Sequence, residues 1–412
     1  MGENFAAKPA EIGGMGGLAQ TSADHLTKLE GLLHEASPST GYDGLMEFLK
    51  APVSECTAAT VARVQARQSV TLAMAAELKR SAWLFSATDH GNAEALARAH
   101  THTEVVNTAT ACTLATTYDV VPGVEQYPAT GEPDLSVPEH KGADIRGMID
   151  STTGVLKDID AAIQTVTNWV SGSAWSPTAQ IVKPLSGNWT ELERAGAIYS
   201  QAGGGCETVG RNLRDGARRL DASWDGRSAI AYQGYVAHLI KALEWEAPSG
   251  RLAERVLAAT SEQIQKSAKA LLQKVNDVIQ EKIIGAGLKD VFVKAATKVL
   301  PGQWIYMAWE IGEAIVELWQ EATKVVDTVK TLINDAKAVI EAIEDPVNFA
   351  EDKAEAAIKD KLEPITNAVH EARDDAKFAA DLTSVADTSA VTGAPSIDFS
   401  VGSGDTPWQS AS

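Results

Sequence analysis

A row of small and apolar residues between positions 192 and 220 restricts the fold more than any other feature of the chain. Its members alternate in steps of three and four: Leu192, Ala195, Tyr199, Ala202, Cys206, Val209, Leu213, Gly216 and Leu220. This spacing places them on one stripe of a helix that packs lengthwise against a partner. We therefore predict a long helix with a close, antiparallel neighbour.

Three consecutive glycines, Gly203-Gly204-Gly205, interrupt this stripe. An interior glycine costs about 1 kcal/mol relative to alanine, so we expect the helix to soften or kink there. No strand precedes the triplet and no lysine follows it, so a phosphate-binding loop is not indicated.

Helical periodicity extends through most of the chain, and β-branched alternation of period two is nearly absent. We predict an all-α protein, an elongated helical bundle of αα-hairpins. The expected parts are a helical hairpin in 1–117, a Pro-rich linker in 118–141, a second hairpin in 142–250, long helices in 251–380 and a disordered tail in 381–412. Pro248 is expected to end a helix, and the linker to span roughly 25 Å as a flexible coil.

Charge and cysteine content exclude several classes of protein. The 412 residues include 55 acidic and 36 basic side chains, a formal charge of -19 that repels nucleic acid. Cys56, Cys112 and Cys206 are too widely spaced for a zinc knuckle and too few for a disulfide scaffold. The N-terminus lacks the features of a cleaved signal peptide.

No catalytic residue, metal site or cofactor is expected. His100 and His102 would point apart on a helix, and further ligands are missing. Glu310, Glu313 and Glu317 recur as the acidic stripe of an amphipathic helix, without the Glu-x-x-His of a di-iron site. Four arginines are expected to pair with carboxylates of the chain: Arg211, Arg214, Arg218 and Arg219.

Trp224-Asp225-Gly226 stands between two amphipathic helices. Glycine at such a bend admits a positive φ, and the indole can cap the apolar seam where the helices diverge. Ser186-Gly187-Asn188-Trp189 opens the hairpin. From about Leu185 to Trp245 this layout resembles the WXG superfamily of ESX, or type VII, secretion substrates.

The first hairpin resembles the EspC-like branch of the same secretion substrates, through Glu3-Asn4-Phe5, residues 9–13 and residues 82–96. That resemblance implies a helix-turn-helix ending in a Y-x-x-x-[DE] export signal. Phe85 and Asp89 have this spacing, with Phe in place of Tyr, and share one helical face. Tyr306 and Glu310 make a second match inside a long apolar helix. A solvated helix end is easier for a receptor to reach, so Phe85 and Asp89 are preferred.

The resemblance implies that the W-x-G turn of one hairpin and the Y-x-x-x-[DE] end of its partner lie side by side in a four-helix assembly. Because one chain carries both halves here, we expect the hairpin of residues 12–105 to pack on that of residues 189–245. Phe85, Asp89, Trp224 and Gly226 would then form one composite secretion signal.

The functional expectation is a non-enzymatic protein exported by an actinobacterial type VII system without a cleaved signal peptide. It would be secreted or at the cell surface and act by protein binding, as an effector or scaffold. Expected partners are the secretion machinery and a co-secreted helical-hairpin protein, with no nucleic acid; membrane contact stays open.

Two other classes are weighed against this expectation. A membrane-active or pore-forming effector would use the Trp-rich amphipathic helix 303–344, with Trp304, Trp309 and Trp319 at a bilayer interface. Its acidic polar face instead favours packing in a helical core. An enzyme is the third class, and residues 250–412 carry no recognisable catalytic site.

Overall fold

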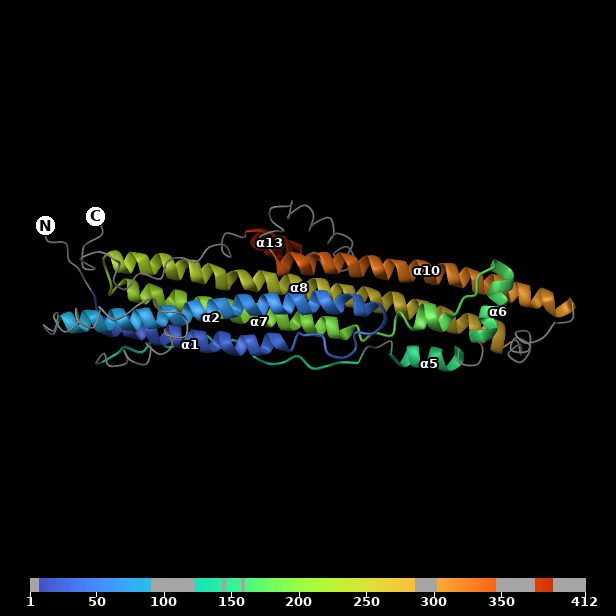
Figure 1. Cartoon of the computed structure of the whole chain (residues 1–412), viewed down its shortest axis with the longest axis horizontal. Helices are drawn as coiled ribbons and strands as arrows, with labels where there is room; N and C mark the ends of the chain where they lie inside the picture. The colour runs from blue at the N-terminus through green and yellow to red at the C-terminus, as the bar shows by residue number, and fades with distance from the viewer. Residues whose placement is uncertain are drawn as a thin grey trace.

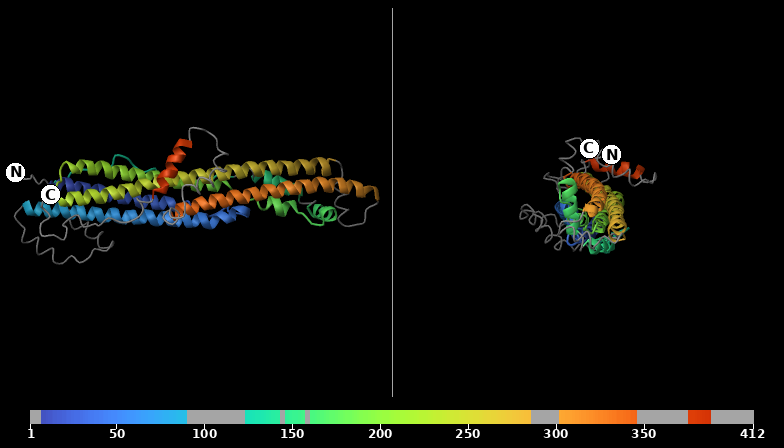
Figure 2. Two further views of the ribbon diagram at one scale, coloured as in Figure 1. Left: turned by 90° about the horizontal axis from the view of Figure 1, so that it is seen from above. Right: turned by 90° about the vertical axis from the view of Figure 1, so that its right-hand side faces the viewer.

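The protein is a long helical rod (Figure 1). The computed structural model describes residues 7–89, 123–142, 146–156, 160–285, 302–345 and 375–387. Over these residues the fold is all-α, an elongated helical bundle, as predicted. An end-on view shows how narrow the bundle is relative to its length (Figure 2).

Four helices form one half of the rod: α1 (Pro9–His34), α2 (Glu47–Asp89), α7 (Thr190–Asp221) and α8 (Arg227–Ile279). A 3-10 turn, η1 (Gly44–Met46), joins α1 to α2. The helices α1 and α2 form one antiparallel hairpin, α7 and α8 form the other, and the two hairpins lie side by side within a single chain (Figure 1).

Several short elements and one further long helix, α10 (Gly302–Glu344), complete the rod. The short elements are α5 (Arg146–Leu156), α6 (Asp160–Ser171), the π-helices η2 (Thr178–Val182) and η3 (Gln280–Ile284), and α13 (Asp375–Ala386). α10 returns along α8, and α13 crosses the bundle steeply near its middle (Figure 2).

The periodic stripe of α7 is confirmed, because all nine of its positions are buried. The glycine triplet does not end or divide α7, which runs unbroken from Thr190 to Asp221. A Cβ on Gly203 would overlap the backbone carbonyl oxygen of Glu246 on α8. Gly203 therefore allows the backbones of α7 and α8 to come into close contact, and the triplet does not interrupt the helix.

Pro248 does not end the helix that contains it, contrary to the prediction. α8 continues through it to Ile279 and crosses the boundary expected at residue 250. Pro248, Ser249 and Gly250 are all buried, and a Cβ on Gly250 would overlap the carbonyl oxygen of Tyr199. Tight packing against α7 outweighs the cost of an interior proline, about 3 kcal/mol for the lost hydrogen bond and the ring clash together.

The Pro-rich segment is also different from the prediction. Its described part, residues 123–142, lies along α7 as an ordered extended segment rather than as a flexible coil. We call this segment the strap. The side chain of Asn212 accepts hydrogen bonds from the backbone N–H groups of Thr130 and Gly131, both at 3.0 Å. Its amide donates to the Gly131 carbonyl at 2.8 Å.

The strap and α7 match in length. From Asn212 back to Thr190 the helix rises about 33 Å at 1.5 Å per residue. From Thr130 to Lys141, at about 3.1 Å per residue, an extended segment covers about 34 Å. Thr190 accordingly donates a 2.7 Å hydrogen bond to the carbonyl of Lys141.

The C-terminal expectations are met only in part. α10 occupies almost the range predicted for it, but the tail expected from residue 381 begins inside α13, which is helical to Ala386. Parts of the range predicted as long helices, residues 286–301 and 346–374, lie outside the described residues, as do residues 388–412, His100, His102 and Cys112.

Candidate functional site

Three aromatic rings meet at one end of the rod. Phe85, near the end of α2, contacts Trp224 edge to face, with ring centroids 6.2 Å apart and planes at 78°. Trp224 in turn lies 5.5 Å from Tyr232 on α8. Such edge and tilted contacts suit the quadrupoles of aromatic rings. The structure therefore brings together the aromatic members of the two predicted half-signals.

The turn that carries Trp224 is held by backbone contacts on both sides. Ser223 N–H bonds to the Leu220 carbonyl at 2.8 Å, and the Ser223 carbonyl accepts from Lys8 N–H at 3.0 Å. Ala7 forms an isolated antiparallel bridge with Trp224. Gly226 has φ of 102° and directly precedes α8, so a residue with a side chain would be strained at this bend.

Arg219 fastens the strap to the same end of the rod. Its guanidinium lies 3.0 Å from the Glu11 carboxylate and 4.0 Å from the centroid of the Tyr127 ring. It also donates to the carbonyl of Gln126 at 2.8 Å. One side chain of α7 thus joins α1 and the start of the strap.

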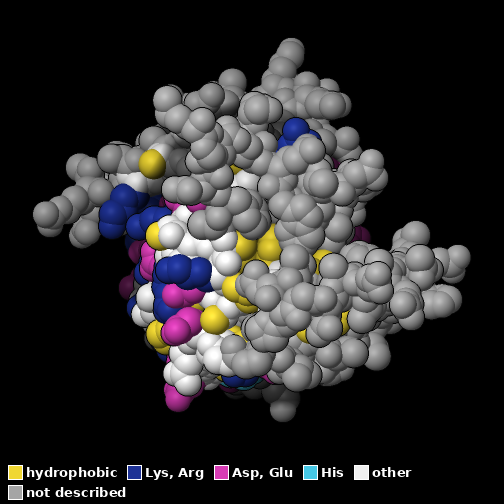
Figure 3. All heavy atoms as spheres, turned by 90° about the vertical axis from the view of Figure 1, so that its left-hand side faces the viewer, with side chains coloured by type: hydrophobic (Ala, Val, Ile, Leu, Met, Phe, Trp, Pro, Cys, Tyr) yellow, Lys and Arg dark blue, Asp and Glu magenta, His cyan; other side chains and the backbone are white. Residues whose placement is uncertain are grey.

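The predicted signal aromatics are not on the surface. Phe85 is 5% exposed and Trp224 is 2% exposed. Exposed residues at the described turn include Asp225, Arg227 and Ile230, the last 59% exposed. Seen end-on, this end shows hydrophobic side chains beside acidic and basic ones (Figure 3). Phe85 and Trp224 therefore hold the turn in place from inside, and the exposed residues of the turn form its accessible surface.

The remaining predicted signal residues are placed by their backbones alone. Asp89 is the last residue of α2, four residues beyond Phe85. Tyr306 and Glu310 lie in the first turns of α10. α10 begins at the end of the rod remote from the α7–α8 turn (Figure 1), so the second match is far from Trp224. Of the two candidate pairs, Phe85 and Asp89 lie on the helix that contacts the W-x-G turn.

A buried ionic cluster in the middle of the rod was not predicted. Glu246 on α8 accepts from Arg63 Nε at 3.0 Å and lies 2.9 Å from Arg67, both arginines being on α2. Burial alone would raise the pKa of Glu246, but Arg63 and Arg67 together hold it below its usual value. Arg63 also donates to the carbonyls of Ile343 and Glu344, the last residues of α10.

Two cysteines lie near this cluster and are unsuited to nucleophilic chemistry. Burial raises the pKa of Cys56 to about 11 and that of Cys206 to about 12. Since the thiolate is the reactive form, these thiols are inert at neutral pH. Both are free cysteines. A cavity of about 10 Å³ beside Cys206 and Glu246 is only large enough for about one water molecule.

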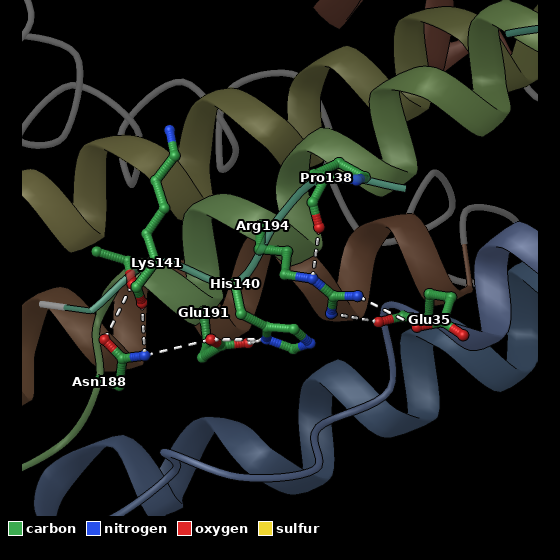
Figure 4. Close-up of polar contacts among 8 residues, drawn as sticks. Glu35, Pro138, His140, Lys141, Asn188, Glu191 and Arg194 are labelled. Carbon is green, nitrogen blue, oxygen red and sulfur yellow. Dashed lines mark hydrogen bonds and ion pairs between the residues drawn. The ribbon is translucent and has the colours of Figure 1, made fainter. Parts of the chain in front are cut away.

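The far end of the strap is held by a second polar network (Figure 4). Arg194 of α7 donates to the Pro138 carbonyl at 2.9 Å and to the Glu35 carbonyl at 2.8 Å. Glu191 lies 3.0 Å from His140 Nδ1 and accepts from Asn188 at 3.2 Å. These contacts join α7, the strap and the end of α1, and they account for the burial of Arg194 and Glu191.

The basic cluster of α7 pairs with carboxylates, as predicted, at three of its four positions. Arg214 pairs with Glu244, Arg218 lies 3.4 Å from Asp215, and Arg219 pairs with Glu11. Among the described residues, no three His, Cys, Asp or Glu side chains group as metal ligands would.

The described apolar side chains of α10 mostly face the bundle. Ile315 and Leu318 are buried, and Trp319 packs partly buried against the core. Glu313 and Glu317 are exposed, as the acidic stripe predicted. The side chains of Trp304 and Trp309 lie outside the described residues. In the described part of the chain, no helix combines the length and apolar character needed to cross a bilayer.

The fold and this end of the rod define a class: a single-chain bundle of two helical hairpins whose W-x-G turn contacts the last turns of the helix leading to Asp89. Comparison adds no family to this description, because no family model, curated protein or solved structure matches the chain.

Proposed function

We propose that this protein is a non-enzymatic substrate of an actinobacterial type VII secretion system and acts outside the cytoplasm by binding other proteins. The observation that carries the proposal is the contact between Phe85 and Trp224, with ring centroids 6.2 Å apart. It joins two motifs that lie 139 positions apart in the sequence. Together with Asp89 and Gly226, they form the composite signal.

Packing between the hairpins supports formation of this signal within one chain. The α2 and α8 helices are antiparallel, and Arg67 donates to the Ala242 carbonyl at 3.0 Å. Further along, Tyr235 donates to the Val70 carbonyl at 3.0 Å. No co-secreted hairpin is needed to complete the aromatic contact, so a partner would bind the finished bundle.

The test is secretion from an actinobacterial host with a working type VII system. Asp89→Asn removes one charge at the end of α2 without changing side-chain size, and Glu310→Gln does the same on α10. We expect Asp89→Asn to lower the ratio of secreted to intracellular protein at least tenfold, and Glu310→Gln to leave it unchanged. Phe85→Tyr, which restores the family's aromatic residue, should export as well as the wild type.

Trp224→Ala should also lower export at least tenfold, with circular dichroism checking that the protein stays helical. Normal export of the Asp89→Asn protein would remove Asp89 from the signal. Equal export from a host whose type VII ATPase is inactivated would overturn the proposal as a whole.

A further inference from the structure

A short C-terminal helix covers a surface of α8 that has the composition of a binding site. α13 packs on α8 near the middle of the rod (Figures 1 and 2). Beneath it lie Trp245, which is 4% exposed, and Arg251. We call these two side chains and the backbone between them the Trp245–Arg251 surface. Trp and Arg are among the residues most enriched where proteins bind tightly.

Two residues of α13, four positions apart, make the contact: Asp381 through its carboxylate and Val385 through its backbone carbonyl. Asp381 accepts from the Arg251 guanidinium at 2.5 Å and 3.1 Å. Trp245 Nε1 donates to the carbonyl of Val385 at 3.4 Å, and the Val385 side chain is buried. A helix that presents a carboxylate and, four residues later, an aliphatic side chain thus matches this surface in charge and spacing.

The cover is weakly held. α13 has 12 residues, a length at which an isolated helix is marginal in water. The Arg251 side chain stays 44% exposed in its ion pair, so solvent screens the arginine side of that pair, while the Asp381 side chain is 9% exposed. The 3.4 Å indole bond is long for a hydrogen bond. Removing α13 would break this ion pair and this hydrogen bond and would leave the indole N–H of Trp245 without its acceptor.

Trp245 is held in place from its other side. The guanidinium carbon of Arg63 lies 5.3 Å from the centroid of the Trp245 ring, within the range of a cation–π contact. Arg63 is itself fixed by Glu246. The indole thus belongs to the rigid core of the rod, so the surface is preformed whether or not α13 covers it.

We propose that the Trp245–Arg251 surface is the binding site for a helix of a partner protein, and that α13 closes it in the free chain. The partner's helix carries a carboxylate and an aliphatic residue four positions later, as α13 does at Asp381 and Val385. This role is separate from the secretion signal at the end of the rod.

The test uses the full chain and a labelled peptide of residues 375–387 as the probe. Asp381→Arg places like charges at the contact and should release α13 from its own chain. We expect the peptide to bind the Asp381→Arg protein at least tenfold more tightly than the wild type, whose site is occupied. Arg251→Asp should abolish peptide binding, and a peptide with Asp381→Arg should bind that variant instead.

Hydrogen exchange supplies the second measurement. Amides of α13 should exchange at least tenfold faster in either single variant and return to wild-type rates in Arg251→Asp/Asp381→Arg, where the charges are swapped. Unchanged exchange in the single variants, or equal peptide binding by the wild-type and Asp381→Arg proteins, would overturn the proposal.

Discussion

Arg63 and Glu246 form an ion pair in the middle of the rod, 3.0 Å between Nε and Oε1, that sets the register of the two hairpins. Phe85 lies 22 residues beyond Arg63 along α2, and Trp224 lies 22 residues before Glu246. Because α2 and α8 are antiparallel, this equal spacing brings the two rings together at the end of the rod. The buried charges and the aromatic contact therefore belong to one alignment.

Glu246→Gln should destabilise the protein strongly. The change keeps the shape of the side chain but leaves the buried Arg67 and the largely buried Arg63 without this counter-charge, and breaking a buried pair typically costs about 3–5 kcal/mol. Urea unfolding followed by circular dichroism measures the loss. The matched control is Glu244→Gln, whose partner Arg214 is 40% exposed, so its cost should stay under about 1 kcal/mol. Equal losses would show that burial of the pair is unimportant.

The same carboxylate should make stability depend on pH in the acid range. Arg63 and Arg67 lower the pKa of Glu246 in the folded protein below the ordinary 4.5. As pH falls below 4.5, the unfolded chain takes up a proton at this residue before the folded one does, so stability decreases. Urea midpoints between pH 3 and pH 6 should fall more steeply for the wild type than for Glu246→Gln. Parallel curves would contradict this assignment.

Neighbouring glycines of α7 should respond in opposite directions to the same substitution. Gly203→Ala forces α7 and α8 apart at the carbonyl of Glu246, and overpacking of this kind typically costs about 1–3 kcal/mol. Nothing lies within 4 Å of a Cβ on Gly204, so Gly204→Ala should stabilise the helix by about 0.5–1 kcal/mol. Thermal unfolding of the two variants measures these changes in stability. A loss of stability in both variants would indicate that α7 needs flexible residues at the triplet.

Asn212→Ala should loosen the strap without melting the bundle. The change removes the acceptor for the backbone N–H groups of Thr130 and Gly131. Hydrogen exchange of those amides should accelerate at least tenfold, while the protected amides of α2 keep their rates. Gln201→Ala removes an exposed bond to Ser136 and serves as the control. Slow exchange in Asn212→Ala would mean that other contacts hold the strap.

Sequence periodicity predicted the helices well, because the spacing of apolar residues along the chain is enough to show which side of a helix is buried. Every member of the Leu192 to Leu220 row is buried, and α10 lies almost where its pattern placed it. The interruption at Pro248 was misread because local propensity cannot register the close packing of Gly250 on Tyr199. At Pro248, tertiary packing overrides the low helix propensity of proline.

The site could be predicted only in part. The two motifs could be read from short patterns, but the depth at which Phe85 and Trp224 lie depends on the whole assembly. Arg63, Arg67 and Glu246 carried no recognisable spacing, since they come from two helices of different hairpins. The prolines of the strap suggested flexibility, whereas Asn212 and Arg194 supply the hydrogen bonds that order it.

The length of the strap between its two anchors must match the length of α7 beside it. The strap advances about twice as far per residue as the helix does, and it is pinned near both ends, at Asn212 and at Thr190. One inserted or deleted residue would displace it by about two helical positions, and neither anchor can slide to compensate. The number of strap residues between the two anchors is thus as constrained as the identity of the anchoring residues. A proline-rich sequence by itself does not indicate such a fixed length.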